Sequence, residues 1–381
     1  MERQSQRLIY LDLKRVIAMM MMIVGHSFFD LVKPDLYSIT QFPWNFWDFL
    51  RGLTAPTFLL ISGIVQVFAN KRINSKVSPE IVYKRIKTAL LLIFLGYFLN
   101  FPVQRAFHIF FVQKSILIPF FQINILQLIG VTLLWVLAYF LLTKDNKQLG
   151  IISLVTGIII FILTPFVHLV NWYEYLPMWL APYFSLSKGS YFPIFPFSGF
   201  IFFGVAFGTY LERFKLEERP EIIRKVGFRW SLPLVAFGTI TYFLINLLNL
   251  PFYDIFKGNP GMSIIRLGLV LMLLALITFL HQKYLGKYEF INYFAKTLGK
   301  NALVVYFVHL VILYGLPWYP SFAVLHQRQF GILESFTIAI LVMVSSFSII
   351  FAFENIASHR KLLKPLFKYG LVSLFILLAL V

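Results

Sequence analysis

The sequence predicts an all-α, polytopic integral membrane helix bundle of about eleven transmembrane helices, in a single domain over residues 1–381. Composition is the first observation that predicts this fold class. Hydrophobic residues make up 59% of the chain and charged residues 13%, whereas a soluble domain carries about 25% charged residues. The 44 Phe and 19 Tyr are also more than one water-soluble core could bury.

Apolar segments of about 20 residues, the length that crosses a bilayer, are the second observation. They are separated by short polar loops, and no linker or low-complexity tract divides the chain. The expected spans lie near residues 16–32, 49–70, 88–106, 121–143, 149–170, 190–211, 230–250, 263–282, 301–317, 331–353 and 366–381.

The distribution of lysine and arginine is the third observation. The net charge is +18, but most of the 34 basic residues fall in alternate segments between the expected spans instead of forming one surface for nucleic acid. Basic loops of membrane proteins face the cytoplasm. We therefore expect a multi-pass protein of a bacterial inner membrane, embedded in the lipid bilayer, with a cytoplasmic N-terminus, an extracytoplasmic C-terminus and no nucleic-acid partner. The sequence leaves a homo-oligomer open.

Several kinds of chemistry are excluded by residues that the chain lacks. It has no cysteine, so it cannot use a thiol nucleophile, a disulfide or a Cys-ligated metal. No pair of histidines has metal-ligand spacing with carboxylates nearby, so we predict no metal site. A P-loop, a dinucleotide fingerprint and a serine elbow are also missing.

Ionisable residues inside the first expected span are the clearest functional signal. They lie three or four residues apart, so they share one stripe of a helix. The members of this first-span stripe are Asp12, Arg15, Met19, Met22, His26 and Asp30. A charged side chain in the middle of a spanning helix costs about 2.5–3.5 kcal/mol on insertion scales. The stripe is therefore expected to face the bundle interior or a cavity.

His26 and Asp30 lie one turn apart at the outer end of this stripe. His26 can act as a general base, with Asp30 orienting its ring or stabilising its protonated form. The alternative is a structural pair that ties the first helix to a neighbour. Ionisable residues within a membrane usually mark sites, which favours the functional interpretation.

The segment 298–309 of the ninth expected span contains a second polar group. Asn301 lies at the cytoplasmic mouth, and His309 is about 12 Å deeper with Tyr306 one turn before it. Asn301 and Tyr306 can hold polar groups of a ligand while His309 lines its path. Spacing alone favours equally a structural role, because Asn and His often bridge membrane helices.

The extracytoplasmic loops are expected to be rich in Trp, Tyr and Pro, as in 41–47. An interfacial aromatic belt is the general explanation, and a platform for a sugar ring or a lipid headgroup is the alternative. Asp48 and Arg51 follow this segment and can pair with each other or face a ligand. Basic residues at the cytoplasmic side orient a protein in the membrane, and here they include Arg15, Lys71, Arg72 and Arg85.

The sequence resembles the transmembrane acyltransferases, namely the heparan-α-glucosaminide N-acetyltransferase-like proteins and their more distant acyltransferase-3 relatives. The resemblance begins with Asp12-x-x-Arg15 ahead of a His-bearing first span, and it extends at intervals along nearly the whole chain. The other similar segments are 56–63, 125–130, 192–199 and 298–309.

The resemblance implies an acyl-CoA-dependent acyltransferase without a permanently bound cofactor. Such proteins move an acyl group, here expected to be acetyl, from cytosolic acyl-CoA to a hydroxyl or amine of an extracytoplasmic glycan or glycolipid. An intramembrane histidine is the implied catalytic residue, either His26 with Asp30 or His309. The residues implied to bind CoA or the other substrate are Asp12, Arg15, Arg51, Lys71, Arg72, Arg85, Asn301 and Tyr306.

Two other classes of protein stay open at this point. A secondary transporter or flippase could use the first-span stripe as a proton or substrate path. A non-catalytic membrane subunit could use the same polar residues only to hold helices together. Acyl-CoA turnover in detergent distinguishes an enzyme from a transporter, because transport needs sealed vesicles.

Overall fold

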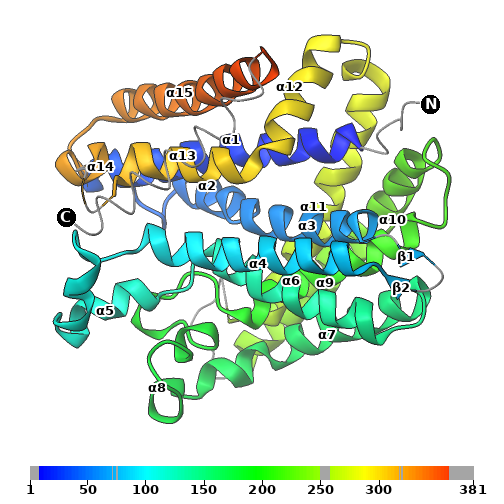
Figure 1. Ribbon diagram of the computed structural model, residues 1–381, viewed down its shortest axis with the longest axis horizontal. Helices are drawn as coiled ribbons and strands as arrows, with labels where there is room; N and C mark the ends of the chain where they lie inside the picture. Colours follow the sequence, from blue (N-terminus) through cyan, green and yellow to red (C-terminus); the bar gives the residue numbers. More distant parts are fainter. Residues whose placement is uncertain are drawn as a thin grey trace. The chain divides into compact units, whose positions relative to one another are not determined.

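The computed structural model describes residues 8–70, 72–73, 76–248, 258–316, 318 and 321–359. Helices make up most of these residues (Figure 1), so the all-α prediction is confirmed. Within the described ranges, the strands are a two-residue antiparallel pair, β1 (Arg72–Ile73) and β2 (Lys76–Val77). The chain divides into two compact units, and each is described by itself.

The first unit comprises residues 1–6, 55–100 and 118–284. Its helices are α3 (Thr54–Ala69), α4 (Pro79–Leu99), α6 (Ile125–Leu142), α7 (Asn146–Leu169), α8 (Trp172–Tyr175), α9 (Ile194–Leu211), α10 (Arg219–Leu247) and α11 (Pro260–Leu280). Its short turns are η3 (Ala181–Tyr183), η4 (Ser187–Gly189) and the π-helical η5 (His281–Leu285), which ends one residue into the second unit. Helices α10 and α11 pack along each other, as do α7 with α9 and α4 with α6.

Glycine lets two helices of the first unit approach closely. A Cβ on Gly204 of α9 would overlap the carbonyl oxygen of Leu60 on α3, and a Cβ on Gly63 of α3 would overlap that of Ile201 on α9. The two backbones therefore touch where α3 crosses α9. Small residues at such crossings are typical of membrane helix pairs.

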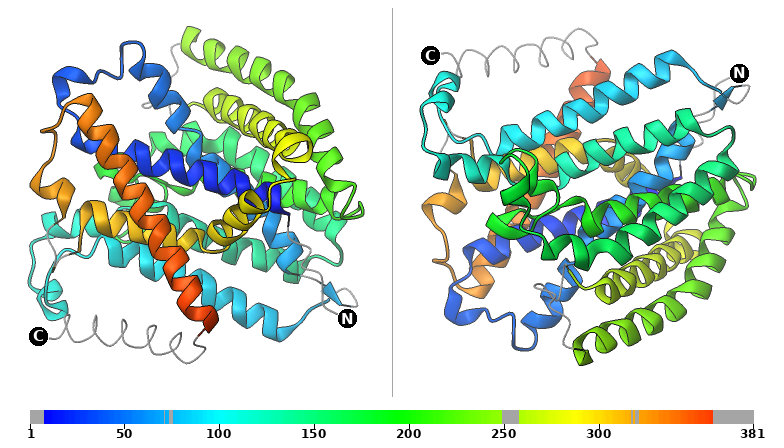
Figure 2. Two further views of the ribbon diagram at one scale, coloured as in Figure 1. Left: turned by 90° about the horizontal axis from the view of Figure 1, so that it is seen from above. Right: turned by 90° about the horizontal axis from the view of Figure 1, so that it is seen from below.

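The second unit comprises residues 7–54, 101–117 and 285–381. Its helices are α1 (Ile9–Leu31), α2 (Trp44–Arg51), α12 (Glu289–Lys300), α13 (Ala302–Tyr314), α14 (Phe322–Leu325) and α15 (Ile332–His359). Its short turns are η1 (Pro34–Leu36) and η2 (Ala106–Phe110), and α5 (Lys114–Phe121) crosses the boundary between the units. Helix α1 packs against α12, α13 and α15 (Figure 2).

Aromatic packing and a backbone bridge hold the C-terminal end of α1. The Phe28 ring is fully buried and lies 5.2 Å from Trp44 of α2 and 4.5 Å from Phe336 of α15, between ring centroids. Val32, directly after α1, bridges to Phe330 in the loop that leads to α15. The C-terminal end of α1 is therefore held by contacts with α2, with α15 and with the loop before α15.

The number of spanning helices is lower than the sequence predicts. Among the described residues, 7 helices are long and apolar enough to cross a membrane, and α12 with α13 makes 8 if that bent pair is one span. Helices α1 and α4, which the sequence counts as spans, carry more charged residues than such helices tolerate. The expected span 366–381 lies outside the described residues. The protein is a multi-pass helical membrane protein, and eleven spans stay a prediction.

Candidate active site

The first-span stripe turns inward, as its spacing predicts. Helix α1 is continuous from Ile9 to Leu31, and Met19 and Met22 in the middle of the stripe are buried. At one end of α1, Asp12 is buried and its side chain lies against Gly299 of α12, where a Cβ would come within 2.6 Å of it. The other end of the stripe meets α13.

Two histidines from distant parts of the sequence meet between α1 and α13. His26 Nδ1 lies 3.4 Å from His309 Nε2. The two rings are stacked, with centroids 5.5 Å apart and planes inclined by 27°. The two candidate bases of the sequence prediction therefore form one pair.

Hydrogen bonding sets the tautomers of this pair. A carbonyl oxygen can only accept, so His309 Nδ1 donates its proton to the Val305 carbonyl at 3.1 Å. In a neutral imidazole the other nitrogen is then an acceptor, so His309 Nε2 receives the Nδ1–H of His26. This arrangement leaves a free lone pair on His26 Nε2.

The two histidines differ in access. His309 is fully buried, whereas His26 is partly exposed. Within the described part of the chain, no residue forms a hydrogen bond with His26 Nε2. A reacting proton can therefore reach His26 Nε2, while both ring nitrogens of His309 are engaged.

Asp30 does not orient His26, contrary to the prediction. Its Oδ2 accepts a short hydrogen bond from the Tyr314 hydroxyl at the end of α13. Spacing of one helical turn puts Asp30 on the same stripe as His26, but its carboxylate reaches across to the neighbouring helix. His309 takes the orienting position. Tyr314 also lies close to His26, with ring centroids 6.3 Å apart.

Arg51 lies beside this histidine pair on α2. Its Nη2 contacts Asp48 Oδ1 at 2.5 Å, so the predicted ion pair is confirmed. Its guanidinium carbon lies 4.8 Å from the centroid of the Phe29 ring. The stem of Arg51 crosses α1 at Gly25, where a Cβ would come within 2.6 Å of Arg51 Cδ. A side chain at position 25 would therefore displace the Arg51 stem from this position.

Arg328 approaches the same aromatic ring from the loop before α15. Its guanidinium carbon is 5.9 Å from the Phe29 centroid. Its backbone has a positive φ of 55° and donates to the Asp30 carbonyl at 2.9 Å. Arg51 and Arg328 both interact electrostatically with the Asp30 carboxylate. Two cations and two carboxylates thus surround one face of α1 next to His26.

The predicted charge pair near the start of α1 is present but loose. Arg15 Nη1 lies 3.7 Å from Asp12 Oδ1. Asp12 is nearly buried, and 15% of the Arg15 side chain is exposed. Part of the Arg15 side chain is therefore accessible at this end of the stripe.

Two of the basic candidates for CoA binding instead stabilise the ends of helices in the first unit. Arg72 donates from Nε to Asn146 Oδ1 at 3.0 Å and from its terminal nitrogens to Thr143, just after α6. Arg85 donates to the Ala69 carbonyl at 2.8 Å and to Asn70 Oδ1 at 2.7 Å, at the end of α3. These contacts favour structural roles for both, and Lys71 lies outside the described residues.

Burial lowers the pKa of the Arg72 guanidinium, and the nearby carboxylates of Asp145 and Glu212 act in the opposite direction. An arginine stays protonated at neutral pH after such a shift. Arg72 therefore stays positively charged while it donates to Asn146 and Thr143.

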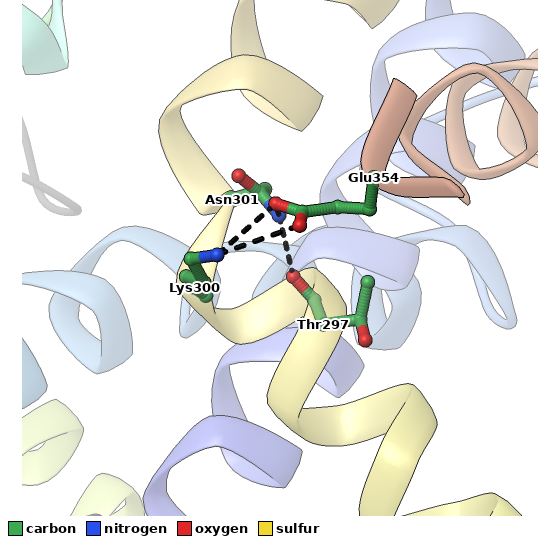
Figure 3. Close-up of polar contacts among 4 residues, drawn as sticks. All are labelled: Thr297, Lys300, Asn301 and Glu354. Atoms are coloured by element: carbon green, nitrogen blue, oxygen red, sulfur yellow. Dashed lines mark hydrogen bonds and ion pairs between the residues drawn. The ribbon is translucent and has the colours of Figure 1, made fainter. Parts of the chain in front are cut away.

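Asn301 lies at the bend between α12 and α13 and has a structural partner. Figure 3 shows its side chain between two helices. Its amide nitrogen donates to Glu354 Oε1 of α15 at 2.8 Å and to the Thr297 carbonyl at 3.0 Å. Lys300 contacts the same carboxylate at 3.2 Å (Figure 3). The amide nitrogen thus holds the bend together, and no contact shown engages Asn301 Oδ1.

Tyr306 lies one turn from His309 on α13, as predicted. The two rings meet edge to face, with centroids 5.4 Å apart. Among the described residues, no side chain or backbone group forms a hydrogen bond with the Tyr306 hydroxyl. This hydroxyl is free to bind a ligand next to the histidine pair.

Three residues of this region were not predicted from the sequence: Tyr314, Arg328 and Glu354. Each acts through a contact with a residue far away in the chain, which no local spacing reveals.

The described residues contain no group of three or more His, Asp or Glu side chains that could hold a metal ion.

The fold defines a multi-pass membrane protein that holds a pair of histidines between α1 and α13. Residues 7–251 match the family described as heparan-alpha-glucosaminide N-acetyltransferase, catalytic, so the chain belongs to this family. The predicted resemblance is confirmed, and the family indicates an acetyltransferase that works in a membrane. A search of curated proteins finds no match.

The matched range separates the two halves of the site. It includes His26, Asp30 and Arg51, and it ends before α13 with Tyr306 and His309. The segment 298–309, which the sequence predicts to be similar to the same proteins, thus lies beyond the match.

Proposed function

We propose that this protein is a membrane-embedded acetyltransferase that moves the acetyl group of cytosolic acetyl-CoA to a hydroxyl or amine of an extracytoplasmic glycan or glycolipid. Acetyl-CoA is a co-substrate here and not a bound cofactor. The observation that carries the proposal is the free lone pair on His26 Nε2, at a partly exposed histidine inside the bundle. Family membership supplies the class of reaction.

His26 acts as the general base in this proposal. The acceptor oxygen or nitrogen attacks the thioester carbonyl, and its proton passes to His26 Nε2 as the new bond forms. The carbon–sulfur bond then breaks, and CoA leaves as a thiolate that takes up a proton. A positioned base contributes typically 10²–10⁴-fold to such a step.

His309 is a positioning residue in the same step. While His26 Nε2 carries the proton, its Nδ1–H still points to His309 Nε2, and this hydrogen bond becomes charge-assisted. Neutral His309 cannot take over as the base because the Val305 carbonyl holds its Nδ1 proton. The pair therefore keeps one lone pair aimed at the acceptor.

The acceptor is proposed to bind near Arg51. This side chain, the Asp48 and Asp30 carboxylates and the Trp44 ring lie at the end of α1 that carries His26. Carboxylates and guanidinium groups can bind sugar hydroxyls, and an aromatic ring can stack on a sugar face. Tyr306 would hold a further polar group from the α13 side.

Arg15 is proposed to hold phosphates of CoA at the cytoplasmic end of the stripe. Its side chain is 15% exposed, and its Nη1 lies 3.7 Å from Asp12 Oδ1. We expect Arg15→Gln to raise the apparent KM for acetyl-CoA about tenfold, because a charge-assisted hydrogen bond contributes roughly 1.5–3 kcal/mol. Steady-state kinetics at saturating acceptor measure this, with Arg224→Gln on α10 as the control. An unchanged KM would leave Arg15 a role in membrane orientation only.

The proposed topology has eleven spans, a cytoplasmic N-terminus and an extracytoplasmic C-terminus in a bacterial inner membrane. Its eleven spans are the 7 candidate helices with α1, α4, α13 and 366–381 added. A reporter that is active only in the cytoplasm should give no signal when it is fused to Val381. The same reporter fused after Lys144, in the loop between α6 and α7, should be active. Activity at Val381 would require an even number of spans.

Acetyl-CoA consumption by the purified protein tests the function directly. In detergent, with amino sugars and glycolipids as acceptors, the protein should release CoA and form an acetylated product. A transporter or flippase would show activity only in sealed vesicles. If acetyl-CoA is never consumed with any acceptor, the acetyltransferase proposal fails.

A further inference from the structure

Charged and aromatic residues share the exposed side of helix α12. Phe290 and Tyr293 are 73% and 58% exposed, and the exposed lysines Lys296 and Lys300 follow them along the helix. Lys287 lies just before the helix, with its Nζ 5.1 Å from the centroid of the Tyr288 ring. Glu289 in the first turn is also exposed, so the exposed side of α12 combines large apolar side chains with a net positive charge.

The opposite side of α12 is packed within the second unit. Ala295, Leu298 and Gly299 are buried, and Gly299 touches Asp12 of α1. Phe294 stacks on Phe351 of α15 with ring centroids 5.7 Å apart. The helix is thus packed against α1 and α15. Tyr293 also lies 5.9 Å from Phe351 between ring centroids, and Lys300 pairs with Glu354, while Phe290 and Lys296 are exposed.

The direction of α12 follows from its bend against α13. The two helix axes differ by 74° at Lys300 and Asn301, and Figure 1 shows the chain turning sharply there. The contacts of Glu354 with Lys300 and Asn301 hold this bend (Figure 3). If α13 runs across the bilayer, α12 lies close to the plane of the membrane.

We propose that α12 is an interfacial helix whose exposed side binds anionic phospholipids of the cytoplasmic leaflet. Phe290 and Tyr293 enter the boundary of the acyl chains, and Lys287 and Lys296 contact the phosphate groups. Helices with aromatic residues and lysines on one amphipathic surface bind in this way, and anionic lipids strengthen the binding. This inference is independent of the proposed acetyltransferase activity.

The positive charge of α12 and its direction relative to α13 favour a lipid over a protein as its partner. The lysines of this region belong to a segment that the charge distribution assigns to the cytoplasmic side, where anionic lipids attract basic residues. A helix parallel to the membrane presents its exposed side along the interface, and Phe290 and Tyr293 are the kinds of residues that enter it. The α12 surface therefore has the composition and the orientation of a membrane anchor.

Spin labels on single cysteines test the inference, because the chain has no native cysteine. Phe290→Cys and Tyr293→Cys would be labelled in the full-length protein in vesicles, with Lys147→Cys as the aqueous control. Collision rates with oxygen and with a water-soluble nickel chelate report the depth of each label. We expect oxygen to dominate at 290 and 293 and nickel to dominate at 147. We also expect a greater depth at 290 in phosphatidylglycerol than in phosphatidylcholine vesicles.

The lysines are tested by a matched pair of double variants that carry the label at 290. Lys287→Gln with Lys296→Gln should remove the difference between the two lipids, and Lys144→Gln with Lys147→Gln should keep it. Nickel access at 290 in both lipids would overturn the interfacial position. A label at 290 shielded from both reagents would indicate protein packing, which also overturns it. Equal depth in both lipids would overturn the role of anionic headgroups.

Discussion

Replacing His26 with alanine is expected to reduce acetyl transfer by 10²–10⁴-fold while binding of acetyl-CoA persists. The reason is that His26 Nε2 is the accessible lone pair of the histidine pair, and a positioned base contributes typically this much. The measurement is the rate of acetylated product formation by the purified variant, with acetyl-CoA binding followed by calorimetry. His108→Ala is the control, because His108 is an exposed histidine of the same unit in the turn η2.

Asp30→Asn should cause a smaller loss than His26→Ala. Asp30 bonds to Tyr314 and not to His26, so the change removes a nearby charge but leaves the base in place. Normal turnover in His26→Ala together with an inactive His309→Ala would show that the base is His309 on α13 and not His26 on α1. If both variants lack any defect and the wild-type protein turns over, neither His26 nor His309 is the base.

The first-span stripe could be predicted because helical spacing is a local property. Residues three or four positions apart share a side of any helix, so the burial of Asp12, Met19 and Met22 together follows from the sequence of α1. The contact between His26 and His309 could not be predicted in the same way. It joins residues 283 positions apart, and no periodicity relates α1 to α13.

Asp30 shows why a shared side of a helix does not imply a contact. The spacing of His26 and Asp30 is correct for neighbours, yet an aspartate side chain is short and bonds to the nearest donor. That donor is Tyr314, which is 284 positions away. The inward-facing stripe is therefore present as predicted, whereas the Asp30 carboxylate bonds to Tyr314 and not to His26, and the catalytic roles of both residues stay predictions.

The basic residues illustrate a different limit. Arg72 and Arg85 have the charge that CoA phosphates need, but the structure uses them to satisfy groups after α6 and at the end of α3. Terminal helix carbonyls lack partners within the helix, and an arginine near them can supply several donors. A sequence shows the charge of such a residue and not the acceptor that it finds first.

His309 is the residue whose replacement separates positioning from catalysis. Its Nε2 accepts from His26 Nδ1, which keeps the His26 lone pair on Nε2. His309→Leu removes this acceptor, so the Nδ1–H tautomer of His26 is no longer favoured over the Nε2–H tautomer. The protonated His26 imidazolium also loses a hydrogen bond. A hydrogen bond to a charged group contributes roughly 1.5–3 kcal/mol, which corresponds to a loss of about 10- to 100-fold in kcat.

His309→Gln supplies the decisive comparison, because the glutamine Oε1 can accept from His26 Nδ1–H where leucine cannot. We expect His309→Gln to recover most of the kcat that His309→Leu loses, with the KM for acetyl-CoA similar in both variants and in the wild type. The pH–rate profile of His309→Leu should also differ from the wild type, since the group that titrates has lost its partner. Equal activity of the leucine and glutamine variants, or a pH profile that does not change, would mean that His309 only fills space between α1 and α13.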